Sequence, residues 1–149
     1  MSNIEIRNAT LEDSQCIVDL FVCYLKFYGK TIVFTQAQDF VEQRLRSGDS
    51  KIYLAIMNGN ACGFCQIYPS FSSLSMGKVW VINDLYVAEA YRRYGVAWQL
   101  LLLVSADAQS EGIISMVLET QRDNHKARSL YEKLGFKPSN DFVVYRKVL

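Results

Sequence analysis

An unusually apolar stretch near the middle of the chain limits the folds open to it. Residues 78–87 read Lys-Val-Trp-Val-Ile-Asn-Asp-Leu-Tyr-Val, with few polar interruptions. A half-exposed strand alternates apolar and polar residues, whereas a strand covered on both faces is apolar nearly throughout. The stretch therefore predicts a central strand with other elements packed on both of its sides.

The stretch leads into a short basic turn, Arg92-Arg93-Tyr94-Gly95-Val96-Ala97, and then into a helical pattern from about Gly95 to Ser110. The first turn of a helix has unpaired N–H groups and the positive end of the helix dipole. Gly95 and Ala97 let a ligand approach the backbone closely, and Arg92 and Arg93 add charge. The turn predicts an anion site suited to a pyrophosphate. It is neither a GxGxxG fingerprint nor a P-loop.

The rest of the chain predicts strands and helices in mixed order. Asn58-Gly59 indicates a tight turn between two antiparallel strands, and the serine-rich residues 69–77 are expected to form a loop. Strands are expected at 4–7, 51–57, 61–68, 78–87, 113–119 (also buried) and 142–148. Helices are expected from Thr10 as N-cap to about 29, then at 36–45, 95–110 and 124–134. This order indicates one α/β or α+β domain over residues 1–149.

Charge and hydropathy argue against several classes of partner. Sixteen Lys and Arg residues balance fifteen Asp and Glu residues, for a formal net charge of +1. The net charge therefore does not favour binding to nucleic acid or to an anionic membrane. No apolar stretch approaches the ~20 residues of a membrane span, and residues 1–5 lack the regions of a signal peptide. We expect a cytoplasmic protein.

The four cysteines include a CxxC pattern at Cys62 and Cys65. A zinc site would need two more ligands at suitable spacing, and Cys16 and Cys23 lie apart in a helical pattern. In a strand, residues three apart face opposite sides of the sheet. We expect buried thiols and no metal site.

Two motifs carry a family resemblance. Arg92, Gly95 and Ala97 form R-x-x-G-x-A, which resembles motif A (Q/R-x-x-G-x-G/A) of the GNAT acetyltransferase superfamily. Residues 123–136 resemble the family's N-x-x-A-x-x-L-Y-x-K-x-G-F signature, with Asn124 and Tyr131 on one helix face. The resemblance covers essentially the whole chain, because residues 6–13 also match the usual family opening.

The resemblance implies a GNAT-like single domain with a mixed, mostly antiparallel sheet of six to seven strands, about four helices, and splayed central parallel strands. It also implies acetyl-coenzyme A (acetyl-CoA) as the cofactor. The expected pyrophosphate contacts are Arg92, Arg93, Tyr94, Gly95, Val96 and Ala97. The expected pantetheine and remaining cofactor contacts are Leu85, Tyr86, Val87, Asn124, Ala127 and Tyr131. Tyr131 is implied as general acid toward the sulfur, and the Leu85 N–H as a donor to the thioester carbonyl.

The general base is open between several groups. Related polyamine acetyltransferases commonly carry two consecutive acidic residues here, but Asn83 stands at the first position, so that carboxylate's role does not carry over. Asp84 could deprotonate the amine, directly or through water, or anchor its ammonium. Glu119 is a second candidate and could equally form a salt bridge. We expect His125, at a helix start, to be solvated.

The acceptor site is expected to be aromatic at its rim. In this fold the helix end at residues 23–29 and the loop at 68–76 border the acceptor cleft. Tyr24, Phe27 and Tyr28, with Asp84 and Glu119 beneath, suit a cationic amine, although core packing accounts equally well for Tyr24 and Phe27. Residues 68–85 look like the histone and polyamine acetyltransferase subgroup, so the acceptor is a polyamine, an amino acid or a lysine of a basic protein.

These observations favour an N-acetyltransferase that moves an acetyl group from acetyl-CoA to a primary amine by direct attack in a ternary complex. The alternative is a non-catalytic acyl-CoA-binding regulatory module, which would need neither Tyr131 nor Asp84. The helix at 96–104 is apolar nearly all round, which indicates a second packed face. A homodimer partner or the chain's own C-terminal strand would cover it.

Overall fold

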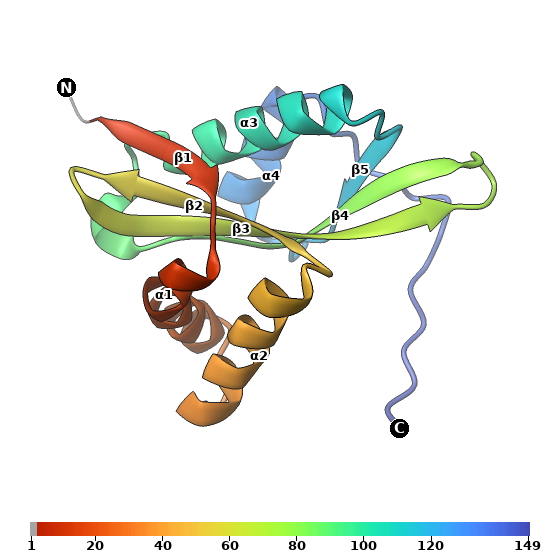
Figure 1. Ribbon diagram of the computed structural model, residues 1–149. Helices are drawn as coiled ribbons and strands as arrows, with labels where there is room; N and C mark the ends of the chain where they lie inside the picture. The colour runs from red at the N-terminus through yellow and green to blue at the C-terminus, as the bar shows by residue number, and fades with distance from the viewer. Residues whose placement is uncertain (1–2) are drawn as a thin grey trace. The chain divides into compact units, whose positions relative to one another are not determined.

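One five-stranded sheet, in the order β1-β2-β3-β4-β5, organises the first 119 residues (Figure 1). β5 runs parallel to β4, and all other neighbours are antiparallel. The strands are β1 (Ile4–Asn8), β2 (Lys51–Met57), β3 (Asn60–Ser72), β4 (Gly77–Val87) and β5 (Ser115–Leu118). The mixed, mostly antiparallel sheet is confirmed, with five strands among the described residues in place of the six to seven expected.

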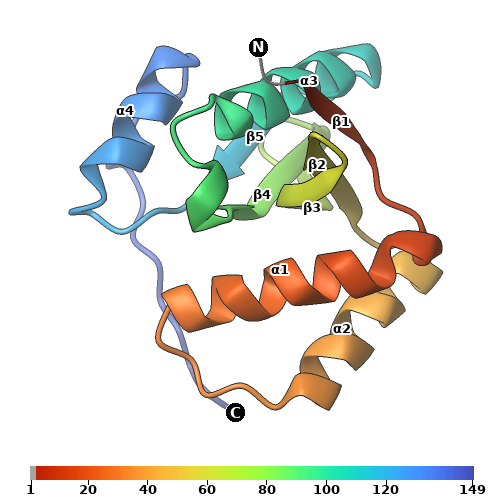
Figure 2. The ribbon, with the colours of Figure 1, turned by 90° about the vertical axis from the view of Figure 1, so that its left-hand side faces the viewer.

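Helices cover both faces of this sheet, as the apolar sequence of β4 predicts. Figure 2 shows α1 (Ser14–Phe27) and α2 (Phe34–Ser47) below the strands and α3 (Val96–Ser110) above them. A short 3-10 turn at Leu11–Asp13 leads into α1, and a second at Glu89–Tyr91 follows β4. The core below the sheet is Ile17, Val18, Leu20, Phe21, Ala37, Val41, Ile52, Leu54 and Phe64. On α3 the buried residues are Val96, Leu100, Leu101, Val104 and Ala108.

The predicted turns at the ends of two elements are confirmed. Thr10 caps the turn before α1 in a reciprocal capping box with Asp13. Asn58 and Gly59 both have positive φ (51° and 80°), which is the conformation that a two-residue hairpin requires.

The serine-rich segment is where the prediction of a loop is wrong. β3 extends to Ser72, and residues 68–72 pair with 77–81 of β4. Beyond Ile67, β3 no longer has β2 beside it, because that ladder ends at Lys51. A strand with a free edge tolerates a proline such as Pro69, so the turn shrinks to residues 73–76.

β5 is shorter and less buried than predicted for residues 113–119. Its side chains alternate between exposed and partly buried. Among the described strands it pairs with β4 alone, so it is an edge strand and one of its sides has no strand neighbour.

The structure describes residues 3–149, which form two compact units that divide between Glu119 and Thr120. Met1 and Ser2, part of the segment judged unlike a signal peptide, lie outside the described residues. The second unit contains α4 (His125–Lys133), which ends before Gly135 at a φ of 93°. One domain over residues 1–149 stays a prediction.

The strand predicted at 142–148 is wrong. Residues 136–149 have no helix or strand, and Phe142, Val143, Val144 and Tyr145 are all at least 74% exposed. β-Branched and aromatic residues such as these favour a strand only when a neighbouring strand accepts their backbone hydrogen bonds, and this segment has none among the described residues.

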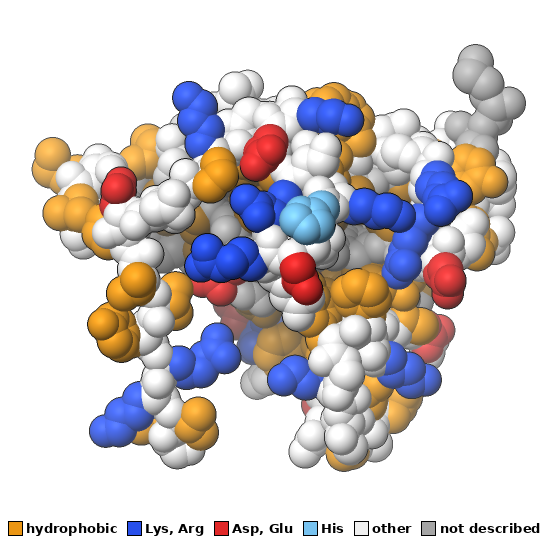
Figure 3. Space-filling view, turned by 180° about the vertical axis from the view of Figure 1, so that it is seen from behind, with side chains coloured by type: hydrophobic (Ala, Val, Ile, Leu, Met, Phe, Trp, Pro, Cys, Tyr) orange, Lys and Arg blue, Asp and Glu red, His pale blue; other side chains and the backbone are white. Residues whose placement is uncertain are grey.

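The surface carries charges of both signs. On the face shown in Figure 3, Lys and Arg side chains lie with Asp and Glu among hydrophobic side chains, in keeping with the net charge of +1. Within residues 3–149, no helix combines the length and the apolar character needed to cross a bilayer.

Candidate functional site

A β-bulge in β4 sets the direction of the side chains around Asp84. Gln66 of β3 pairs with Asp84 and the next residue, Ile67, pairs with Ile82, so Asn83 has no partner in β3. The extra residue reverses which side chains face which side of the sheet. Asp84 consequently contacts Tyr24 of α1, whereas Trp80 lines a hollow beside the end of α3.

Asp84 is a buried acid, with 6% of the residue exposed. Gln66 Nε2 donates a 2.8 Å hydrogen bond to its Oδ2, and the Tyr24 side chain also hydrogen-bonds to the carboxyl group. Burial raises the pKa of Asp84, and the hydrogen bonds from Gln66 and Tyr24 oppose that rise. A carboxylate of this kind can hold an ammonium group or accept its proton.

The aromatic residues predicted for the acceptor site lie together at the end of α1. The Tyr24 ring centroid is 5.1 Å from that of Tyr28 and 6.1 Å from that of Tyr86, and Phe27 is 5.3 Å from Tyr28. Tyr24 also packs on Phe64 of the core at 5.8 Å. It therefore belongs to both the core and the surroundings of Asp84, while Phe27 and Tyr28 are 57% and 42% exposed.

Among the described residues, no strand pairs with the second half of β4 on its β5 side. The ladder between the two strands ends where Ile82 pairs with Leu118. Leu85, Tyr86 and Val87 pair with β3 only. Backbone N–H and C=O groups on that edge can bind an extended ligand as a neighbouring strand would.

The turn before α3 has the backbone of an anion site. Arg93 and Gly95 have positive φ (72° and 79°), and Gly95 is the N-cap of α3 without a side-chain capping bond. A Cβ added to Gly95 would meet no heavy atom within 4 Å, so open space lies where a side chain at this position would project. This arrangement fits the pyrophosphate of coenzyme A.

Arg92, one of the expected pyrophosphate contacts, also has partners within the fold. Its Nε donates to the Val87 carbonyl oxygen at 2.9 Å. Its guanidinium carbon lies 5.6 Å from the ring centroid of Phe27 and 5.7 Å from that of Tyr86. Arg92 thus connects the turn to β4 and to the end of α1, although it is exposed, as Arg93 and Tyr94 are.

The predicted site residues of the second unit lie on or beside α4. Asn124 is the N-cap, and its Oδ1 accepts a 3.2 Å hydrogen bond from the Ala127 N–H. Tyr131 is partly buried, and its ring lies 6.0 Å from that of Phe136. His125 is exposed, as expected. Glu119, at the end of the first unit, is exposed and takes part in no salt bridge found within residues 3–149.

Sequence reasoning missed two residues behind Asp84. Ser50 Oγ donates a 2.9 Å hydrogen bond to Gln66 Oε1, and Gln66 is only 2% exposed. The available signal was a glutamine in the middle of an otherwise apolar strand, Cys62-Gly63-Phe64-Cys65-Gln66-Ile67. Buried polar side chains are hydrogen-bonded almost without exception, so such a glutamine indicates a polar partner inside the fold.

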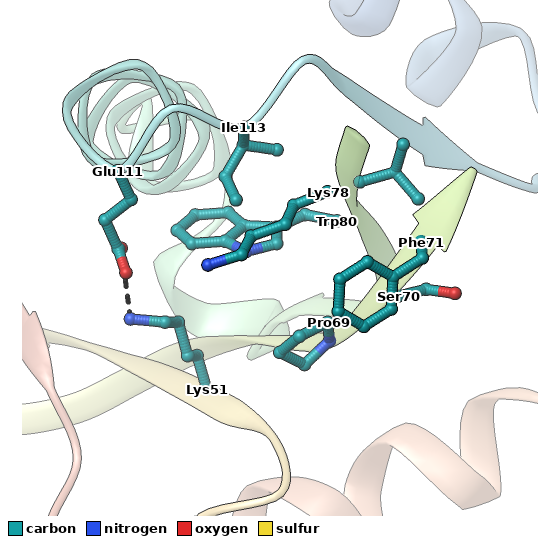
Figure 4. Close-up of a pocket in the computed structure, with 9 residues that line it drawn as sticks. Lys51, Pro69, Ser70, Phe71, Lys78, Trp80, Glu111 and Ile113 are labelled. Atoms are coloured by element: carbon teal, nitrogen blue, oxygen red, sulfur yellow. Dashed lines mark hydrogen bonds and ion pairs between the residues drawn. The ribbon is translucent and has the colours of Figure 1, made fainter. Parts of the chain in front are cut away.

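The hollow beside the end of α3 lies near the start of β4 (Figure 4). Its volume is about 260 Å³, and its lining is Lys51, Pro69, Ser70, Phe71, Lys78, Val79, Trp80, Glu111 and Ile113. Lys51 Nζ lies 3.1 Å from Glu111 Oε2 and 5.2 Å from the Trp80 ring centroid. None of the predicted site residues lines it.

The thiols are only partly as predicted. Cys62 and Cys65 are buried, but Cys16 is only partly buried and Cys23 is exposed on α1. The buried thiol predicted at Cys23 is wrong, because helical spacing alone does not decide which positions of α1 are covered. All four are free cysteines, and residues 3–149 contain no cluster of three or more potential His, Cys, Asp or Glu metal ligands.

Known proteins resemble this chain in sequence and in fold. The model of the acetyltransferase (GNAT) family matches residues 17–136. The uncharacterized N-acetyltransferase YhfO of Bacillus subtilis (strain 168) is 37% identical over 142 residues, which cover 95% of each chain. The crystal structure of a probable acetyltransferase is 41% identical, with a TM-score of 0.91 over 97% of each chain. The aminoglycoside N-acetyltransferase AAC(6')-Iy in complex with CoA shares the fold, with a TM-score of 0.81 at 21% identity, over 99% of this chain and 96% of that one.

Proposed function

The chain belongs to the acetyltransferase (GNAT) family and is an acetyl-CoA-dependent N-acetyltransferase, and from this premise we propose that its acceptor is the primary amine of a small cationic molecule. The observation that carries the proposal is the buried Asp84 carboxylate with the Tyr24 and Tyr86 rings beside it. A carboxylate attracts an alkylammonium, and aromatic faces add cation–π attraction. Polyamines and amino acids carry such groups.

Asp84 acts in this proposal on the proton of the amine. Only a neutral amine attacks a thioester, so the ammonium must first lose a proton. The Asp84 carboxylate holds the ammonium and takes the proton, directly or through a water molecule. Because burial raises the pKa of Asp84, its carboxylate is a stronger base than an exposed one. Glu119 is the second candidate base, although it is exposed.

Residues of the turn and of β4 hold the cofactor in this proposal. Bound acetyl-CoA supplies the acetyl group as a thioester. The backbone from Arg92 to Ala97 binds the pyrophosphate, which is supported by the open space at Gly95. The free edge at Leu85, Tyr86 and Val87 aligns the pantetheine arm, and the Leu85 N–H donates to the thioester carbonyl oxygen. The family resemblance adds Asn124, Ala127 and Tyr131, with the Tyr131 hydroxyl as proton donor.

The test of the acceptor class is thiol release from acetyl-CoA across polyamines, amino acids, aminoglycosides and basic peptides. We expect turnover with small cationic amines. Asp84→Asn should lower kcat/KM by about 10²–10⁴-fold, and Asp39→Asn, an exposed acid on α2, should leave it unchanged. Turnover restricted to basic peptides would identify a protein-lysine acetyltransferase instead. Acetyl-CoA binding without turnover on any acceptor would identify the non-catalytic module.

The role of Tyr131 has a separate test. Tyr131→Phe removes the hydroxyl and keeps the ring that contacts Phe136. Turnover should fall by about 10²-fold or more, because general acid catalysis is lost, while the Kd for coenzyme A stays nearly unchanged. An unchanged kcat would remove Tyr131 from the mechanism.

We extend the proposal to a homodimer located in the cytoplasm. Trp98 and Leu102 lie one turn apart on α3 and are 37% and 47% exposed, which supports a partner on that face. Four free cysteines suit a reducing compartment. Sedimentation should give a dimer that Leu102→Lys converts to a monomer, whereas Gln99→Lys, also exposed on α3, should leave it intact. A monomeric parent protein would contradict the dimer.

A further inference from the structure

The side-chain amide of Gln66 is buried, and both its nitrogen and its oxygen form hydrogen bonds. Its Nε2 donates to Asp84 Oδ2 at 2.8 Å, and its Oε1 accepts from Ser50 Oγ at 2.9 Å. Its neighbours along β3, Cys65 and Ile67, are fully buried. Burying an amide in such surroundings is unfavourable unless its polar atoms are paired. A methionine would fill a similar volume without that requirement, so packing alone does not explain a glutamine here.

We propose that Gln66 is a positioning residue for acetyl transfer, with its amide oriented by Ser50 so that it holds the Asp84 carboxylate in one direction toward the acceptor amine. This inference rests on the proposed function, in which Asp84 acts on the amine. Gln66 itself touches neither the acceptor nor the cofactor in this proposal and works through Asp84.

The direction of the hydrogen bonds explains why Ser50 acts together with Gln66 and Asp84. An ionised carboxylate only accepts hydrogen bonds, so the Nε2 side of the amide must face Asp84. Turned by half a rotation, the amide would present Oε1 to the carboxylate and repel it. The Ser50 hydroxyl donates to Oε1 and thereby stabilises the productive orientation. Donor-to-acceptor chains of this kind strengthen each hydrogen bond in turn.

The fold places the three residues in line across adjacent strands. Ser50 directly precedes β2, and Gln66 and Asp84 are paired residues of β3 and β4. The bulge at Asn83 is what puts the Asp84 side chain opposite Gln66, because the ladder shifts register at that point. A strand pair is a rigid support, so the carboxylate is held before any substrate arrives.

The titration of Asp84 reports on this contact. The groups that interact with it are Tyr24 of α1, by a hydrogen bond, and Cys65 and Tyr68 of β3, by charge. Hydrogen bonds from Gln66 and Tyr24 favour the ionised form. Removing the Gln66 donor therefore raises the pKa of Asp84, and the acid limb of the pH profile moves to higher pH.

The experiment compares kcat, KM and the pH profile of kcat/KM in four variants of Gln66 and Ser50, using an accepted amine. Gln66→Met should lower kcat by about tenfold or more, keep the KM for acetyl-CoA, and move the acid limb up by roughly half a unit to one unit. Gln66→Glu should move the limb further, because two adjacent carboxyl groups resist joint ionisation. Ser50→Ala should give a smaller loss that Ser50→Thr, which keeps the hydroxyl, largely avoids.

Gln38→Met is the matched control, because Gln38 Nε2 also donates to a carboxylate, Glu42 Oε1 at 3.2 Å, within α2. It should change neither kcat nor the pH profile. If Asp84→Asn abolishes turnover but Gln66→Met leaves kcat and the acid limb unchanged in a folded protein, the inference is overturned while the proposed function stands.

An NMR titration of the Asp84 carboxyl carbon distinguishes failure of the positioning role from failure of the proposed function. It measures the pKa of Asp84 in the parent protein and in Gln66→Met, whether or not any acceptor turns over. An upward shift in the variant supports the contact, and an unchanged pKa overturns the positioning role. Absence of turnover with every acceptor would count against the proposed function alone.

Discussion

Arg92 Nε donates a 2.9 Å hydrogen bond to the carbonyl oxygen of Val87, at the end of β4. The same guanidinium group lies over the rings of Phe27 and Tyr86. One side chain therefore connects the turn before α3 with the strand that carries Asp84 and with the last turn of α1. These contacts help to hold the turn in position.

Arg92→Met should consequently affect both stability and cofactor affinity. The variant loses one hydrogen bond and two cation–π contacts at an exposed site, which together are worth about 1 kcal/mol of unfolding free energy. The KM for acetyl-CoA should rise several-fold because the turn is less well held. Urea denaturation and initial rates measure the two effects. Arg46→Met, an exposed arginine of α2, is the control, and equal effects from both variants would contradict the role of Arg92.

The sequence was most informative where a local pattern has one physical solution. The continuous apolar run of residues 78–87 is β4, covered on both faces as predicted. Asn58-Gly59 is a hairpin, since both residues readily take positive φ. Residues 142–148 show the limit. Their β-branched and aromatic residues are suited to a strand, but a strand also needs a partner, and the sequence of one segment does not state which partner it has.

The sequence named candidate residues for the site but did not indicate how they are held. Tyr24, Phe27 and Tyr28 were named as the acceptor rim, and they do lie near Asp84 or near one another. The contact of Gln66 with Asp84 joins residues 18 positions apart. It depends on strand register and on an unpaired residue in β4, and register is a property of pairing that a local pattern does not contain.

Asp13 should make stability depend on pH at the acidic end. The hydrogen-bonded Arg7 side chain, at 2.8 Å, lowers the pKa of Asp13 from 3.8 to about 2. Because the folded-state pKa is the lower one, the stabilisation is complete above about pH 5 and is lost as the pH falls toward 2. Asp13→Asn should cost about 1 kcal/mol at pH 7, since solvent screens the pair, and much less at pH 3. A difference that stays constant between these pH values would contradict the pair's role.

Gly63 and Gly77 should differ sharply in their tolerance of alanine. A Cβ at Gly63 would lie 2.8 Å from the Tyr86 carbonyl oxygen, which is backbone of the paired strand, whereas a Cβ at Gly77 would meet the Ile114 side chain. Ile114 is half exposed and can move. Gly63→Ala should therefore cost about 2–3 kcal/mol and Gly77→Ala less than about 1 kcal/mol. Thermal and urea unfolding give the order, and a larger loss for Gly77→Ala would contradict it.

Thiol labelling should resolve three classes of cysteine. Cys23 is exposed and should react first. Cys16 should react slowly, because partial burial raises the pKa of its thiol and its Sγ donates to the Asp13 carbonyl oxygen at 3.1 Å. Cys62 and Cys65 should react only in denaturant, as burial raises the pKa of both thiols. Cys23→Ser should remove the fast phase alone, and a remaining fast thiol would show that the sheet is more open than described.

Gly95 offers the sharpest test of the proposed pyrophosphate site in the turn before α3. At this position the effect of backbone strain on stability can be separated from the effect of side-chain volume on cofactor binding. Its φ of 79° is strained for any residue with a Cβ, but no heavy atom lies within 4 Å of the position that a Cβ would take. Gly95→Ala should therefore lower stability by about 1 kcal/mol through strain. Gly95→Asn should cost less, because asparagine tolerates the left-handed region.

Cofactor affinity should follow the opposite order. The larger asparagine side chain fills more of the space beside the first N–H groups of α3, so it should raise the Kd for acetyl-CoA more than alanine does. Gly48, the C-cap of α2 with a φ of 63° and equally open surroundings, provides the control. Gly48→Ala and Gly48→Asn should reproduce the two stability changes and leave the Kd, measured by calorimetry, unaltered. If the Gly95 variants also left the Kd unaltered, the pyrophosphate would have to bind elsewhere, since a ligand at this turn must lie within reach of the added side chain.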